Sequence, residues 1–524
     1  MSEKIYDVLV VGAGPVGLTA GLLFQRMGIN ALLVDSRSTM NHHPKARSLN
    51  IRSMEIFRTL GIEAAIREWD FPREARRVLW LESFCGEEMA RISIDNALAT
   101  RYSPCEVAGL SQARLEDVLR TSIKKDLVSI QYGTEFINFV EEEDCIVATL
   151  SKENGETFQV RARYLLAADG ARSPTRKLLE IPAIGKEEFG KYVSIYFKAN
   201  PYPMAPERPS VIYFMLGEAS FGRFIQSVNC EDEWLMGIKL SPEMEKDDSD
   251  FHKEYCLQFI RNTFEIPDLK IEILDIEFWH MRVQIAENFR KGRLFLAGDA
   301  AHLLSPAGGF GMQTGIQDVH NLCWKLAHVI QGKMPEEILD TYHEERFPTV
   351  KSNMDWSRQN TQGYTAIMIA GQSGDRKKLQ DVVSSQWPIL NSIGQDIGFS
   401  YQSSLLIPDG TQAPAITATQ YLPNARPGSR APHLWLQGPN GMISTIDLFM
   451  DSFILLTDAD GKSWTKTLQN MHPTLSFRCV TIGKNGDYND MNNDFHELYG
   501  IKRGGAVLVR PDGHVYWRSV NSTV

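Results

Sequence analysis

The N-terminal part of the chain carries its clearest hydrophobic pattern. An unbroken apolar run at 8–11 is typical of a strand that is buried on both faces of a parallel sheet. Leu18 and Leu22 follow at helical spacing after a glycine-rich turn, and a second apolar run ends at Asp35. The pattern therefore predicts a strand–helix–strand unit at the start of a parallel sheet.

Two later segments repeat the feature of an apolar strand that ends in an acid beside glycine. One lies at 164–168, before Asp169, and the other at 294–297, before Gly298 and Asp299. Because successive strands of an α/β domain return to one sheet, we expect both segments to join the first sheet. Residues that are distant in the sequence would then build one site.

The segment 183–285 differs from its surroundings because short β-branched and aromatic runs dominate it. We expect a sheet domain inserted into the first domain, which then comprises 1–182 together with 286–400. After Gly311 the apolar residues have helical spacing as far as Gly332, a residue suited to the end of a helix, and more helix follows.

A proline-rich stretch separates this region from the C-terminal part of the chain. Residues 401–426 predict an extended linker. Residues 427–524 predict a small α/β domain that ends in a hairpin around Asp512 and Gly513.

Composition and charge narrow the class of protein. The chain has 524 residues, 43% of them hydrophobic and 23% charged, which is the usage of a folded globular protein. Its net charge of -10 repels a phosphate backbone, so we expect no nucleic-acid partner. The seven cysteines form no CxxC pair, which fits a reducing cytoplasm. No apolar run is long enough to cross a bilayer, so we expect no membrane partner and a cytoplasmic monomer or homodimer.

A GxGxxG pattern stands between the first predicted strand and the first predicted helix. Glycines let the backbone approach a pyrophosphate, whose charge then meets the amides and the positive dipole end of the helix. An acid at the end of the next strand can accept the hydroxyls of a ribose. The predicted dinucleotide contacts are Gly12, Gly14, Pro15, Val16, Gly17 and Asp35.

Four further segments carry chemistry-bearing residues in a fixed order. Residues 292–302 read Gly-Arg-Leu-Phe-Leu-Ala-Gly-Asp-Ala-Ala-His and lead through a glycine-rich loop into the long predicted helix. An Asp-Gly segment lies at 168–176, a Pro-Lys-Ala-Arg segment at 44–47, and a Leu-Ser-Gln-x-x-Leu-Glu segment at 110–116.

Together these segments resemble the motifs of the single-component (class A) FAD-dependent aromatic hydroxylases. Residues 430–448 and 499–518 resemble the C-terminal domain of the phenol, chlorophenol and polyketide hydroxylases. The resemblance implies an α/β protein with a Rossmann-like FAD-binding domain, an inserted β-sheet substrate domain and a thioredoxin-like C-terminal domain. Here that last domain has no CxxC, so it cannot form an internal redox disulfide.

The resemblance also implies which residues contact FAD. Asp299 would hold the ribityl chain, and the helix after Gly311 would point its N-terminus at the flavin, where it stabilises negative charge on the reduced ring. The segment with Asp169 and Gly170 would serve both FAD and the nicotinamide cofactor. The other implied FAD contacts are Ser36, Arg37, Lys45, Arg47, Gln112, Gly298, Pro306, Gly309 and Met312.

The implied reaction is the hydroxylation of a phenolic or polycyclic aromatic substrate. NADPH or NADH would reduce FAD, and O₂ would then form a C4a-hydroperoxyflavin that transfers oxygen to the ring. With only one GxGxxG present, the nicotinamide cofactor must bind transiently. Our catalytic candidates are Pro306, through its carbonyl, and Tyr213, Arg223 and His280, and we expect no metal ligand.

Two alternatives stay open at this point. A Baeyer–Villiger oxygenase on the same scaffold differs only in its substrate, and a non-catalytic FAD- and ligand-binding protein would share the same motifs. Flavin halogenases carry a Trp-x-Trp-x-Ile-Pro segment. No two of the ten tryptophans here lie two positions apart, so a flavin halogenase is disfavoured.

The inserted segment supplies enough aromatic surface to wall a planar ligand. Because side chains alternate along a strand, half of these residues must face away from it. The residues are Tyr192, Tyr196, Phe197, Tyr213, Phe214, Phe221, Phe224, Trp234 and Trp279.

Overall fold

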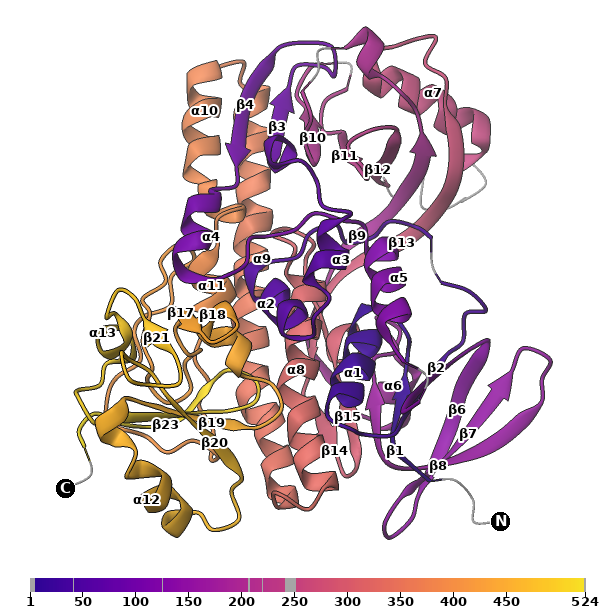
Figure 1. Cartoon of the computed structure of the whole chain (residues 1–524). Coiled ribbons are helices and arrows are strands. Elements are labelled where there is room, and N and C mark those ends of the chain that lie inside the picture. Colours follow the sequence, from indigo (N-terminus) through magenta and orange to yellow (C-terminus); the bar gives the residue numbers. More distant parts are fainter. Residues whose placement is uncertain are drawn as a thin grey trace.

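A parallel sheet forms around the predicted N-terminal unit (Figure 1). The computed structural model describes residues 5–40, 42–124, 126–205, 208–218, 220–240 and 251–522. Both later apolar segments return to this sheet, so that the carboxyl ends of its parallel strands meet at one edge. In spatial order its strands are β14 (Arg290–Lys291), β15 (Leu294–Leu296), β8 (Thr157–Ala167), β1 (Ile5–Val11), β2 (Ala31–Asp35) and β5 (Val128–Tyr132), with the hairpin β6 (Thr134–Glu141) and β7 (Ile146–Lys152) attached to β8.

A second sheet occupies the other end of this domain. Its long strands β9 (Ala183–Lys198) and β13 (Glu272–Ala286) pair antiparallel. Three of its strands lie outside the predicted range 183–285: two come from residues 77–93, where β3 (Arg77–Leu81) pairs in parallel with β10 (Ile212–Met215), and one comes from residues 302–303. The order is β16 (His302–Leu303), β13 (Glu272–Ala286), β9 (Ala183–Lys198), β12 (Glu233–Lys239), β11 (Phe224–Ser227), β10 (Ile212–Met215), β3 (Arg77–Leu81) and β4 (Glu88–Ser93).

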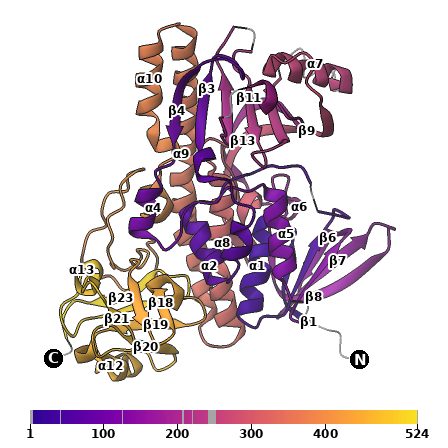
Figure 2. The ribbon, with the colours of Figure 1, turned by 45° about the horizontal axis from the view of Figure 1, so that its top comes forward.

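Helices cover both sheets and connect them. The helix α1 (Pro15–Arg26) packs against α8 (Phe310–Ile330), and α9 (Thr341–Gln372) extends from there along the second sheet (Figure 2). On that sheet α7 (Lys253–Phe264) covers one face, while α9 and α10 (Arg376–Ser385) cover part of the other. The shorter helices are α2 (Ile51–Thr59), α3 (Glu63–Arg67), α4 (Asn96–Tyr102), α5 (Gln112–Ser122), α6 (Pro174–Leu178) and α11 (Ile393–Ile397).

The C-terminal domain has the strand arrangement of thioredoxin. A parallel pair is joined by a helix, and the final hairpin, around the predicted turn at Asp512 and Gly513, adds antiparallel to the same sheet. The sheet order is β20 (Phe477–Thr481), β19 (Phe453–Thr457), β22 (Ala506–Val509) and β23 (Val515–Ser519). Around it lie α12 (Trp464–Met471), α13 (Phe495–Tyr499) and a smaller sheet of β17 (Trp435–Gly438), β18 (Gly441–Ser444) and β21 (Asn489–Asp490).

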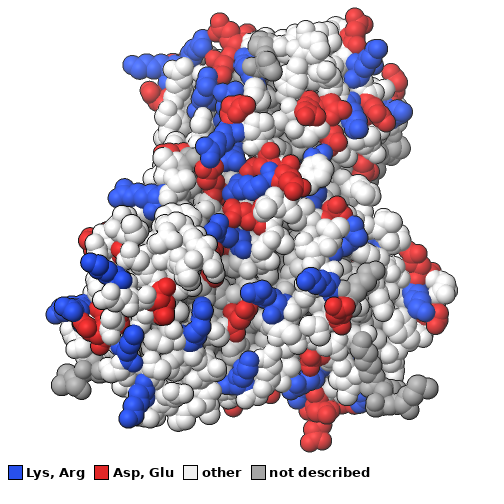
Figure 3. Space-filling view, in the orientation of Figure 1, with Lys and Arg blue, Asp and Glu red and all other residues white. Residues whose placement is uncertain are grey.

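Acidic and basic side chains are interspersed on the face of the molecule drawn in Figure 3. Within the part of the chain that the structure describes, no helix combines the length and the apolar character needed to cross a membrane.

Candidate functional site

The glycine turn joins β1 to α1 at the carboxyl edge of the first sheet. A Cβ on Gly12 would lie 2.2 Å from the carbonyl oxygen of Ala168, and a Cβ on Gly17 would lie 1.9 Å from that of Gly12. At Gly14 a Cβ would meet nothing within 4 Å, so this part of the backbone faces open space. The turn is therefore closed toward the protein and open on its other side, a shape that admits a pyrophosphate.

Asp35 ends β2 beside this turn. Its carboxylate accepts hydrogen bonds from the Ala13 N–H at 2.8 Å and from the Arg37 backbone and guanidinium at 2.9 Å. Burial acts to raise the pKa of Asp35, but these donors hold it below its ordinary value. The carboxylate is ionised and fixed, with the exposed Ser36 between it and Arg37.

The predicted Gly298–Asp299 turn follows β15 at the same edge. Gly298 adopts a φ of +59°, and a Cβ there would lie 2.9 Å from Cγ2 of Val16 in the glycine turn. The Asp299 side chain is exposed, yet enough protein surrounds it to raise the pKa of its carboxyl above the ordinary value. These two facts together mean that Asp299 faces a cleft inside the molecule rather than the outer surface.

The loop between β2 and α2 closes the cleft from another side. Its Ser48 hydroxyl lies 3.3 Å from where a Cβ on Gly309 would be, and the Gln112 N–H donates to the Ala46 carbonyl at 2.7 Å. Gln313, in the first turn of α8, donates to the backbone carbonyl of Ser48 and accepts from the Ser53 hydroxyl of α2. The Gln313 side chain is thus directed into the protein.

The N-terminus of α8 itself faces the cleft. A Cβ on Gly311 would meet nothing within 4 Å, so no side chain blocks the first turn of the helix. Pro306 is exposed in the loop before the helix, and Met312 is half-buried. The predicted contacts Pro306, Gly309, Gly311 and Met312 therefore follow one another along this loop and the first turn of α8.

Arg47 brings a positive charge into this region. Its guanidinium donates to the carbonyl of Ser227 at 2.7 Å, and burial lowers its pKa to about 9. Among the described residues no carboxylate lies within ion-pair distance of it. A half-buried cation that is matched only by carbonyl dipoles is a candidate binding point for an anion.

Asp169 supplies a second unmatched group. One carboxylate oxygen accepts from the Thr175 N–H at 3.0 Å, and the other is buried and has no hydrogen-bond partner among the described residues. Gly170, with a φ of +79°, turns the chain directly after it. The Asp169 backbone lies beside the glycine turn, because its nitrogen is 3.1 Å from where a Cβ on Gly12 would be.

The second sheet separates the predicted aromatic residues by face. Phe197, Tyr213 and Trp234 belong to the core beneath α7. The opposite face carries Tyr192 stacked on Trp279, with ring centroids 4.8 Å apart. Further partly exposed rings on that face are Tyr196, Phe214, Phe221 and Phe224, with Tyr364 of α9 against Phe214.

This division gives no support to a catalytic role for two of the candidates. Tyr213 is buried and donates to the Arg208 carbonyl at 2.8 Å, so its hydroxyl is satisfied inside the α7 core. Arg223 donates to Thr263 at 3.1 Å and lies over the ring of Phe259, both on α7.

His280 lies on the outer surface of β13. Its Nδ1 is 2.8 Å from a Glu188 oxygen, and its side chain is 43% exposed. This position gives no support to a catalytic role either.

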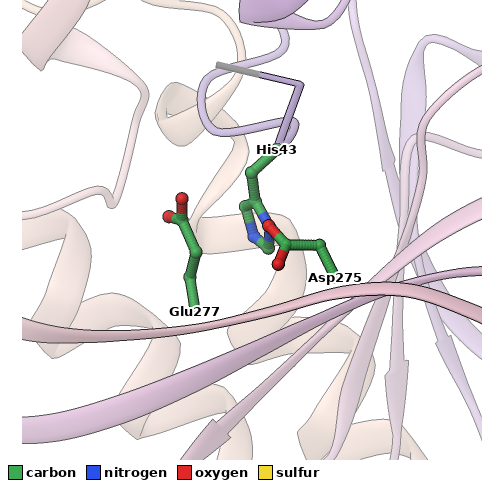
Figure 4. Close-up of side chains that lie close together, drawn as sticks. All are labelled: His43, Asp275 and Glu277. Carbon is green, nitrogen blue, oxygen red and sulfur yellow. The ribbon is translucent and has the colours of Figure 1, made fainter. Parts of the chain in front are cut away.

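Three side chains near the β2–α2 loop are of the types that bind divalent cations. Figure 4 shows the His43 ring beside Asp275 and Glu277, which extend from β13. His43 Nδ1 lies 2.9 Å from Asp275, while the Lys45 ammonium lies 3.4 Å from Glu277. Because Lys45 already supplies positive charge, we interpret the cluster as an ion-pair tie between the loop and the second sheet.

Sequence reasoning missed the groups that hold the Asp299 turn. Asp318 of α8 accepts from the Gly298 N–H at 3.0 Å and pairs with Arg346 of α9 at 2.8 Å. His302, the last residue of the 292–302 segment, lies 2.6 Å from the same Asp318. The one available signal was an acid within an otherwise buried helix, where an unpaired charge is costly.

The fold and the cleft together define an FAD-dependent flavoprotein, and comparisons with known proteins identify its family. Residues 5–357 match the FAD binding domain family, and residues 424–523 match the aromatic-ring hydroxylase C-terminal family. The chain belongs to this family of FAD-dependent aromatic hydroxylases and is a flavoprotein monooxygenase.

Individual relatives match over nearly the whole chain. The tetracenomycin B2 monooxygenase-dioxygenase of Streptomyces olivaceus is 31% identical over 98% of this chain and 95% of its own length. The phenol 2-monooxygenase of Pseudomonas sp. (strain EST1001) is 30% identical over 98% of this chain and 90% of its own. The crystal structure of the flavin-dependent monooxygenase PieE, in complex with FAD and substrate, is similar with a TM-score of 0.92 at 28% identity, over 99% of this chain and 97% of that one.

Proposed function

We propose that this chain uses NADPH or NADH to reduce bound FAD and hydroxylates a phenolic or polycyclic aromatic compound. One atom of O₂ enters the ring and the other leaves as water, with the nicotinamide supplying the two electrons. The observation that carries the proposal is the face of the second sheet with Tyr192, Trp279, Phe214 and Phe224, which offers partly exposed rings to a planar substrate.

The proposed FAD site is the cleft at the carboxyl edge of the first sheet. Support comes from the open backbone at Gly14, the orphan oxygen of Asp169 and the unmatched charge of Arg47. When bound, FAD accepts hydride and activates O₂. The proposed contacts are Gly12, Gly14, Pro15, Val16, Gly17, Asp35, Ser36, Arg37, Lys45, Arg47, Gln112, Asp169, Gly170, Gly298, Asp299, Pro306, Gly309, Gly311 and Met312.

The chain's own groups orient the substrate and exclude water. Aromatic rings stack on a planar substrate and displace solvent from it. Pro306 is exposed beside the N-terminus of α8, and its carbonyl accepts from the Gly309 N–H at 3.0 Å. The second lone pair of this carbonyl is the proposed acceptor for the substrate hydroxyl. The tetracenomycin and phenol relatives act on aromatic compounds by their names, which supports this class of substrate.

Turnover in ¹⁸O₂ tests the proposal. Phenols and polycyclic phenols are offered with NADH or NADPH, and product mass and nicotinamide oxidation are measured together. We expect an accepted substrate to accelerate oxidation and to gain one ¹⁸O atom. Conversion of a ketone into an ester or lactone, with phenols yielding only hydrogen peroxide, would establish Baeyer–Villiger chemistry instead.

A further inference from the structure

Asp318 is a buried acid that the proposed reaction does not use directly. It lies in α8, and its side chain has no exposed surface. One carboxylate oxygen accepts from the Gly298 N–H at 3.0 Å and lies 2.6 Å from His302 Nε2. The other accepts from Arg346 Nε at 2.8 Å. Three partners therefore converge on one carboxylate.

The charge of Asp318 is compensated within the protein. Burial acts to raise its pKa, but His302, Arg346 and the Gly298 N–H hold the pKa below its ordinary value. Arg346 is itself fixed, because its remaining nitrogens donate to the Thr314 carbonyl at 3.1 Å and the Tyr401 hydroxyl at 3.2 Å. The network is rigid on the side away from the cleft.

On its other side the network holds the turn before Asp299. Gly298 lies between Asp318, which accepts from its N–H, and Val16, whose Cγ2 is 2.9 Å from where a Cβ would be. We propose that Asp318 is a positioning residue for FAD, which fixes the Gly298 peptide so that Asp299 presents its carboxylate to the cleft. The proposal rests on the proposed contact between Asp299 and FAD.

The chemistry of the site favours a carboxylate over its neutral isostere. The Gly298 N–H and the Arg346 guanidinium are donors, and His302 donates through Nε2 in the tautomer that suits the 2.6 Å contact. An Asn at 318 has one acceptor oxygen, so its amide N–H₂ would face a donor. The isostere fills the same volume but cannot hold both the turn and Arg346.

The test measures FAD binding to the apoprotein by flavin fluorescence quenching, in parallel with unfolding of the apoprotein. The variants are Asp318→Asn, Asp299→Ala and the double variant, with Glu345→Gln as the matched control. Glu345 is the neighbour of Arg346 and an equally buried ion-paired carboxylate, but its partners Lys325 and Arg510 lie toward the C-terminal domain. Both Asp318→Asn and Glu345→Gln should therefore lower stability.

We expect Asp318→Asn and Asp299→Ala each to raise the Kd for FAD at least about tenfold, and Glu345→Gln to keep it within about twofold of wild type. Because Asp318 acts through the Asp299 turn, the double variant should bind FAD no more than about threefold worse than Asp299→Ala alone. A merely structural role would not produce this non-additivity.

Several outcomes would overturn the proposal. Additive losses in the double variant, or equal losses in Asp318→Asn and Glu345→Gln, would leave Asp318 with a structural role only. Wild-type affinity in Asp299→Ala would refute the proposed FAD contact itself, whatever Asp318 does. If Asp318→Asn does not fold, Arg346→Lys takes its place, since it keeps the charge but cannot reach all three of its acceptors. Wild-type affinity in that variant would also count against the proposal.

Discussion

The buried Glu345 and the half-buried Arg47 both carry charge, and their surroundings differ. Glu345 accepts from Lys325 at 2.9 Å and from Arg510 at 2.6 and 2.9 Å, and none of the three side chains has exposed surface. Arg510 and Lys325 hold the pKa of Glu345 below its ordinary value despite burial. Arg47 has only backbone carbonyls, and burial lowers its pKa to about 9.

The same contrast holds over two whole regions. At the junction with the C-terminal domain, Glu55 of α2 pairs with Arg52 and with Arg430, which lower its pKa to about 2. In the proposed FAD site, burial raises the pKa of Asp299, and one oxygen of Asp169 has no hydrogen-bond partner among the described residues. Charges that hold the fold are paired within the chain, whereas the charges proposed to meet a ligand lack such partners among the described residues.

The largest effect should come from breaking a paired charge at the junction. Arg510→Leu leaves the buried Glu345 with Lys325 as its one cationic partner among the described residues, so we expect the free energy of unfolding to fall by about 3–5 kcal/mol in denaturant titrations. The control is Arg503→Leu, whose exposed side chain pairs with Asp460 and should cost less than about 1 kcal/mol. Equal losses of stability in the two variants would show that the buried pair contributes no more than the exposed pair.

Asp396 is a buried acid outside the proposed FAD contacts. It tests whether burial without a cationic partner lowers the free energy of unfolding. The Asn50 amide donates to it at 2.9 Å, and burial raises its pKa to about 7. The folded protein then keeps a proton that the unfolded chain releases, so this group's contribution to stability falls as pH rises from about 4 to 7. We expect Asp396→Asn to be roughly 2–4 kcal/mol more stable than wild type at about pH 8 and equal to it near pH 4.

Urea titrations at several pH values check this slope. If the stability difference between Asp396→Asn and wild type does not change with pH, burial does not raise the pKa of Asp396 in the folded protein.

Arg47→Met should separate stability from binding. Removal of an unpaired cation leaves no charge orphaned, so we expect the apoprotein to be as stable as wild type while the Kd for FAD rises about tenfold. Arg77→Met is the control, because that guanidinium likewise donates to a carbonyl, that of Pro209 at 3.0 Å, but is not among the proposed FAD contacts. A loss of stability in Arg47→Met with unchanged FAD binding would place Arg47 among the structural charges.

Much of the fold could be predicted because its signals are local. The apolar run at 8–11, the glycine turn and the helix that ends before Gly332 each follow from neighbouring residues. The strands at 77–93 could not be assigned to the second sheet, because their pairing with β10 depends on residues more than a hundred positions away. Alternation also predicted that half of the aromatic residues face away, but not which half.

For the site, motifs predicted the segments that meet and not the groups that fix them. Asp35 and Asp299 end strands at one edge, as parallel strands require. The pairing of Asp318 with Arg346 joins two helices, and no local pattern encodes such a contact. The same is true of Arg430, which meets Glu55 across the domain junction.

The smallest effect should come from His280, which pairs with Glu188 at the surface. It shares the α7 side of β13, whereas the adjacent Trp279 stacks on Tyr192 on the opposite face. We expect His280→Ala to keep kcat/KM within about twofold of wild type with an unchanged unfolding midpoint, because an exposed pair contributes little. Trp279→Ala should raise KM for the aromatic substrate about fivefold or more, because it removes a stacking surface. A large loss of kcat in His280→Ala together with unchanged KM in Trp279→Ala would show that the substrate lies on the other face of the sheet.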